Sequence, residues 1–150
     1  MSARLGILAY GPDAQLHTQC QAALLSTIAF APAGVETIVL TDRPDSYLWL
    51  EDSVTIEHLT AAVLQRWRGP TDDRYRPKIE ALRWLAAGGA AHVVLVDTDT
   101  LARRSLAPML QRLILPTSDQ DQTNLRMRLM TAGYRHAQAA FVGGSLVPHG

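Results

Sequence analysis

The strongest constraint in the sequence is an apolar run, Val93 to Val96, that leads directly into two carboxylates separated by one residue. Such a run of mostly β-branched residues is typical of a strand that helices cover on both faces of a parallel sheet. Asp97 and Asp99 then fall at the carboxyl end of the strand, where open α/β sheets bind their ligands. If the chain stays extended, both carboxylates lie on one side, with their Cα atoms roughly 6–7 Å apart. We therefore predict a metal–phosphate site, because one or two carboxylates plus substrate phosphates commonly hold Mg²⁺. The alternative is that both are polar turn residues that close the strand.

Composition excludes several classes of protein. The chain has 150 residues, enough for one domain with its own core, and we expect residues 1–150 to form a single domain. The formal net charge is zero, so we expect no nucleic-acid partner. No apolar run is long enough for a membrane span, and the N-terminal residues lack a signal-peptide pattern, so we expect a cytoplasmic protein. Cys20 is the only cysteine, which excludes an intramolecular disulfide.

The first forty residues follow a strand–helix–strand pattern. We expect a strand over 5–10, a helix that begins near Pro12 or Asp13, and a second strand over 35–40. Two strands joined in this way are parallel, so their carboxyl ends share one edge of the sheet. Tyr10 and Asp42 therefore lie at the same edge as Asp97 and Asp99. The pattern predicts an α/β fold with a mostly parallel sheet and helices on both faces.

The rest of the chain adds further elements. We expect a strand over 53–59, a short helix or irregular crossing over 60–67, and helices over 77–87, 105–113 and 123–133. The charged segment 66–76 is either a surface loop or a flap that faces a substrate. Residues 139–147 read as a last strand or strand-turn. The glycines within it, Gly143 and Gly144, either let the backbone approach a ligand or form a tight bend.

These motifs resemble the metal-dependent glycosyltransferases of the GT-A type, which carry a D-x-D motif and use nucleotide-diphosphate sugars. Arg76–Leu85 followed by Val93–Leu101 looks like the helix and D-x-D arrangement of glycogenin-like enzymes. Ile38–Pro44 and Ala140–Ser145 look more like the blood-group-type galactosyl and N-acetylgalactosaminyl transferases. The resemblance implies a Rossmann-like GT-A sheet in a three-layer sandwich.

The resemblance also implies a role for each candidate residue. Asp99 would bind a Mn²⁺ or Mg²⁺ that bridges the donor phosphates, and Asp97 would contact the ribose or share the metal. Lys78, the only lysine of the chain, would meet the phosphates, the sugar or Asp97. Tyr10 would flank the base and Asp42 would lie near the nucleoside, whereas Gly143 and Gly144 would border the sugar pocket. A UDP-sugar is the expected ligand. Such an assignment is chemically consistent, because a metal and a cation stabilise the departing diphosphate.

Two of these residues also have simpler interpretations. Lys78 is otherwise a solvated or salt-bridged side chain, and Tyr10 otherwise only packs at the end of its strand.

Members of these families continue past the last strand, where they place the acceptor site and a catalytic group. We therefore expect the acceptor half to be missing from 1–150, and the catalytic residue stays unassigned. A shortened last strand would leave a sheet edge open to self-association.

Two other functions fit the same motif. Asp97-Thr98-Asp99-Thr100-Leu101 also matches the signature of haloacid-dehalogenase-like phosphatases, in which the first aspartate is the nucleophile. In that family the motif normally opens the domain, and a lysine follows it, whereas no lysine follows Asp97 here. A non-catalytic nucleotide-binding or structural α/β module is the other alternative.

Overall fold

The computed structural model describes residues 2–113 and 138–141. Its sheet has the order β3-β2-β1-β4-β5. Three parallel pairings join β1 (Ala3–Ala9) to β2 (Val35–Thr41), β1 to β4 (His92–Val96), and β2 to β3 (Thr55–His58). The remaining strand, β5 (Gln138–Phe141), runs antiparallel to β4. The expected α/β fold with a mostly parallel sheet is therefore confirmed.

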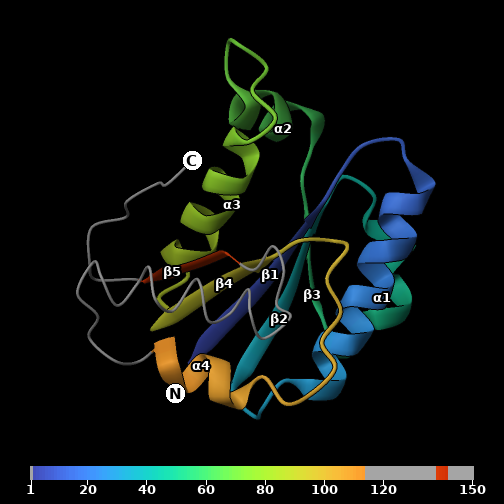
Figure 1. Cartoon of the computed structure of the whole chain (residues 1–150). Helices are drawn as coiled ribbons and strands as arrows, with labels where there is room; N and C mark the ends of the chain where they lie inside the picture. The colour runs from blue at the N-terminus through green and yellow to red at the C-terminus, as the bar shows by residue number, and fades with distance from the viewer. Residues whose placement is uncertain (1, 114–137, 142–150) are drawn as a thin grey trace.

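Helices cover both faces of the sheet, which gives the predicted three layers (Figure 1). One face packs against α1 (Ala14–Phe30), the 3₁₀ helix η1 (Pro44–Leu50) and α4 (Ala107–Leu113). The other face packs against α2 (Ala61–Arg68) and α3 (Arg76–Ala87). Successive residues of β4 divide between the two cores, since Val94 joins the first cluster and Val93 the second. This alternation explains why the strand is apolar throughout.

Local sequence signals set the helix boundaries. Asp13 caps α1, and its carboxylate accepts a hydrogen bond from the backbone N–H of Gln15 at 2.9 Å. Thr60 caps α2 in the same way, through the N–H of Val63 at 3.3 Å. Pro77 lies in the first turn of α3, where a missing N–H costs nothing. The helix expected to begin near Pro12 or Asp13 thus begins at Ala14.

Some expectations differ from the structure or fall outside it. The 3₁₀ helix η1 was not predicted, because seven residues are too few for a helical apolar period. The segment expected as a strand over 53–59 pairs only over Thr55–His58, and segment 60–67 is helical, as one of its two interpretations predicted. The expected helix over 123–133 lies outside the described residues. Within the described part of the chain, no helix combines the length and the hydropathy that a membrane crossing needs.

The centre of β1 packs tightly against α3. A Cβ atom added to Gly6 would lie 2.5 Å from Cδ1 of Leu85, which is fully buried. We predict that Gly6→Ala lowers the free energy of unfolding by about 1–3 kcal/mol, because the buried Leu85 side chain must shift within a packed core. Urea denaturation measures this. In a double-mutant cycle with Leu85→Ala, the two losses should be less than additive, whereas simple additivity would contradict the close contact.

Candidate functional site

The strand register brings three predicted residues to one edge of the sheet. Ala9 pairs with Thr41 in β2, and Ile7 of the same strand pairs with Val96 in β4. Tyr10, Asp42 and Asp97 therefore leave three adjacent parallel strands at their carboxyl ends. Neighbouring strands are about 4.8 Å apart, so the three positions span one continuous strip of this edge.

Lys78 joins this edge from α3. Its Nζ atom donates a hydrogen bond to Oδ1 of Asp97 at 2.6 Å, and the two side chains are 33% and 20% exposed. Lys78 reaches Asp97 because α3 leads into β4 and packs beside it. The pair places a cation next to the first carboxylate of the D-x-D motif.

The two carboxylates of that motif do not lie along an extended chain. The backbone N–H of Thr100 donates to the carbonyl of Asp97 at 3.1 Å, which closes a turn over 97–100. The expectation of simple alternation was wrong, because the chain reverses as soon as β4 ends. Asp99 is exposed in this turn, whereas Asp97 is half-buried beside Lys78.

The two carboxylates Asp97 and Asp99 at this edge are too few to hold a metal ion without ligands from a bound molecule. Among the described residues, no group of three or more His, Cys, Asp or Glu side chains is placed to bind a metal. Asp99 offers an exposed carboxylate, and Asp97 already faces the Lys78 ammonium. Such a set fits Mg²⁺ or Mn²⁺ bound jointly by one or two carboxylates and by phosphate oxygens, and it does not fit an all-protein metal cage.

A pocket of about 500 Å³ adjoins the ends of β1 and β2. Tyr10, Gly11 and Asp42 form one side, and the guanidinium of Arg68 lies 5.3 Å from the centre of the Tyr10 ring. The opposite wall comes from α2 and the segment after it: Ala61, Leu64, Gln65, Arg68, Gly69 and Asp72. The sequence alone did not identify this wall, although one interpretation of segment 66–76 was a flap facing a substrate. The pocket has the size of a small-molecule site.

Asp42 is only partly satisfied at the edge of this pocket. Its Oδ2 atom accepts a hydrogen bond from the backbone N–H of Gly11 at 3.0 Å. Its Oδ1 atom is buried and has no hydrogen-bond partner among the described residues. Gly11 has a φ of +104°, a backbone conformation that favours glycine. The Gly11 turn thus presents its N–H to Asp42 next to the pocket.

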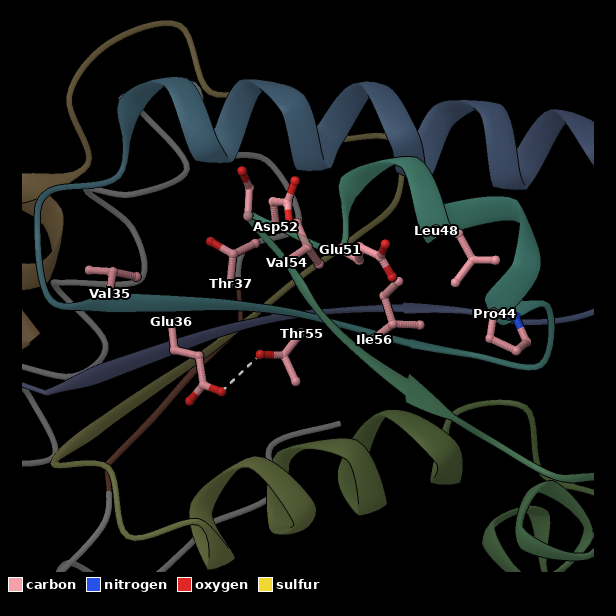
Figure 2. A pocket seen from close by; sticks show the side chains of 11 residues that line it. Val35, Glu36, Thr37, Pro44, Leu48, Glu51, Asp52, Val54, Thr55 and Ile56 are labelled. Atoms are coloured by element: carbon pink, nitrogen blue, oxygen red, sulfur yellow. Dashed lines mark hydrogen bonds between the residues drawn. The ribbon is translucent and has the colours of Figure 1, made fainter.

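A second cavity of about 590 Å³ lies between β2, β3 and η1 (Figure 2). Its carboxylates include Glu36, which accepts hydrogen bonds from Thr55 at 3.1 Å and from Arg4 at 2.8 Å. None of the residues predicted to bind a ligand lines this cavity, although it is the larger of the two. The pocket at Tyr10 and Asp42 is therefore the better candidate. Gly143 and Gly144 lie outside the described residues.

Of three comparisons with known proteins, only the comparison with solved structures found a similar fold. No protein-family model matches the sequence, and no curated protein matches it. Among solved structures, S. aureus TarS, a glycosyltransferase, aligns with a TM-score of 0.50 and 14% identity. The chain has a glycosyltransferase-like fold. The alignment covers 75% of this chain but only 19% of TarS, and at such low identity the similarity concerns the fold alone.

Two buried groups of the core between the sheet and α1, Cys20 and Tyr47, make a pH-dependent contribution to stability. Burial raises the pKa of the Cys20 thiol from 9.0 to about 11, and burial also raises the pKa of Tyr47 above its ordinary value. Both groups ionise first in the unfolded chain. Stability is therefore fully present below pH 9 and falls as the pH rises toward 11, by on the order of 2 kcal/mol for the thiol.

Urea denaturation at pH 7, 9 and 10.5 tests this expectation. Cys20→Ala removes the thiol, so its stability should fall less steeply with pH than that of the unaltered chain, even though the packing loss lowers its stability at pH 7. Parallel pH profiles for the two proteins would contradict a buried, neutral thiol.

Proposed function

We propose that this chain binds a nucleotide-diphosphate sugar, with a UDP-sugar as the ligand, and forms the donor half of a glycosyltransferase. The observation that carries the proposal is a nucleoside-sized pocket at the same sheet edge as the Lys78–Asp97 ion pair, which the exposed Asp99 follows in the chain. Parallel α/β sheets bind ligands at this edge. The aligned part of this chain spans only 19% of TarS. Glycosyl transfer by a whole enzyme that contains this chain therefore belongs to the proposal.

The base half of the ligand fits the pocket at Tyr10. The Tyr10 ring, with the Arg68 guanidinium over one side, contributes aromatic surface to the pocket. Asp42 offers a carboxylate whose Oδ1 atom has no hydrogen-bond partner among the described residues. Uracil carries an N–H at ring position 3, between two carbonyl groups. A small rotation of the Asp42 carboxyl group would let it accept that hydrogen, and a charged acceptor strengthens such a bond.

The diphosphate half fits the neighbouring cluster. Asp99, with Asp97 beside it, would hold Mn²⁺ or Mg²⁺ together with the phosphates, and the cation would neutralise the departing diphosphate. Lys78 adds a fixed positive charge and keeps the Asp97 side chain in one orientation at 2.6 Å. The exposed Asp99 is therefore the primary metal ligand in this proposal. We place Gly143 and Gly144 at the sugar pocket on the resemblance alone.

The phosphatase alternative makes a different prediction from the same residues. There Asp97 would attack the phosphorus of a small phosphoester, and Asp97→Asn would abolish hydrolysis. A non-catalytic α/β module would show neither hydrolysis nor nucleotide binding. Assays of UDP binding and of phosphoester hydrolysis on the same preparation therefore separate the three functions.

We predict that calorimetry of the purified chain detects UDP binding that strengthens at least about tenfold with Mn²⁺. Asp99→Asn should remove the effect of the metal, because it removes the exposed carboxylate. The matched control is Asp52→Asn, which changes an exposed carboxylate at the cavity of Figure 2 and should leave binding unchanged. A folded chain that does not bind UDP with or without Mn²⁺ would contradict the proposal.

We also predict a preference for UDP over CDP of about ten- to a hundredfold. Cytosine has an acceptor nitrogen where uracil has its N–H, so it would face the Asp42 carboxylate with like-charged lone pairs. Asp42→Asn should narrow or reverse this preference, since a carboxamide can donate as well as accept. Asp45→Asn, an exposed neighbour in η1, is the control. Equal affinities for UDP and CDP in the unaltered chain would place the base elsewhere.

A further inference from the structure

Directly behind the pocket at Tyr10 lies a buried histidine that does not line it. His17, in the first turns of α1, is only 4% exposed. Its Nδ1 atom lies 2.8 Å from the Tyr47 hydroxyl, and its Nε2 atom lies 3.0 Å from the carbonyl oxygen of Gly11. The same Nε2 atom is 3.9 Å from Oδ1 of Asp42. Both ring nitrogens therefore have a defined partner.

These partners fix the hydrogen positions on the ring. A carbonyl oxygen can only accept, so Nε2 of His17 carries the hydrogen that points toward Gly11. In a neutral imidazole the other nitrogen is then an acceptor, and the Tyr47 hydroxyl donates to it. Tyr47 comes from η1 and is fully buried, and it contacts the ring at the nitrogen that does not bond to Gly11.

Gly11 is consequently held at both of its peptide groups. Asp42 accepts the N–H of Gly11 at 3.0 Å, and His17 donates to its carbonyl at 3.0 Å. Gly11 follows Tyr10 directly and adopts a φ of +104°, so its neighbours rather than regular secondary structure maintain its conformation. Any movement of the His17 ring changes both the Gly11 turn and the surroundings of the buried Asp42 oxygen.

We propose that His17, oriented by Tyr47, is a positioning residue that sets base selectivity by holding the Gly11 turn and the Asp42 carboxylate in place. The proposal rests on the assignment of this pocket to the nucleotide base. His17 acts through Asp42 and Gly11, because it is not among the residues that line the pocket. Its effect should therefore appear in the discrimination between bases as well as in affinity.

Three variants separate positioning from general packing. His17→Phe keeps a ring but removes both hydrogen bonds, and we expect UDP binding to weaken at least about tenfold while the ratio of UDP to CDP affinity falls. His17→Gln keeps a donor near Nε2, so binding should stay within about threefold of the unaltered chain. The control is Thr27→Val, which alters another buried polar side chain of α1, 3% exposed, and should change neither affinity nor selectivity.

If His17→Phe does not fold, Tyr47→Phe replaces it as the test variant. It removes only the hydroxyl that holds Nδ1, and we expect a weakening of about threefold with reduced selectivity. The proposal is overturned if the folded variants of His17 and Tyr47 keep the affinity and selectivity of the unaltered chain. It is equally overturned if Thr27→Val loses as much selectivity as they do.

Amide hydrogen exchange at Gly11 makes the test independent of UDP. We expect exchange at Gly11 to be at least about tenfold faster in His17→Phe, or in Tyr47→Phe, than in Thr27→Val. If the unaltered chain fails to bind UDP but this difference holds, the proposed function fails and the positioning of Gly11 stands. Unchanged exchange in the His17 and Tyr47 variants overturns the positioning role whatever the nucleotide data show.

Discussion

The parallel pairing of β1 with β2 on one side and β4 on the other is the constraint on which the candidate site depends. The register Ala9–Thr41 and Ile7–Val96 aligns the ends of three strands, so the residues that follow each strand meet at one edge. Gly6 permits the close approach of α3 at the centre of β1. That same helix supplies Lys78 to Asp97. Packing at the middle of the sheet thus positions charges at its end.

The candidate site divides into a base half and a phosphate half with different physical character. In the base half, Asp42 and the buried His17 both bond to Gly11, so the three residues form one hydrogen-bonded network. The phosphate half consists of the Lys78–Asp97 ion pair and the exposed Asp99. Among the described residues, the buried Oδ1 atom of Asp42 has no hydrogen-bond partner. Such an acceptor suits recognition of one base, because a wrong base leaves it unpaired. Exposed charges suit a cation and phosphates, which bring their own ligands and water.

The sequence predicted those parts of the fold that periodicity and strand ends determine. The apolar run at Val93–Val96 and the strand–helix–strand unit implied a parallel sheet, and the shared edge of Tyr10, Asp42 and Asp97 followed from it. Contacts between distant segments leave no local signal in the sequence. Neither the pocket wall contributed by α2 nor the contact of Tyr47, in η1, with His17 was therefore predicted. The turn over 97–100 was missed because alternation holds only while a chain remains extended.

The most direct test is an NMR titration of the isotopically labelled chain with UDP in the presence of Mg²⁺. We predict that amide signals of Gly11, Asp42, Lys78 and the turn over 97–100 shift together with one dissociation constant, because a single ligand spans both halves of the site. Signals of Thr55–His58, beside the cavity of Figure 2, should not move. Shifts confined to that cavity, or a folded chain whose signals do not respond to UDP, would contradict the account.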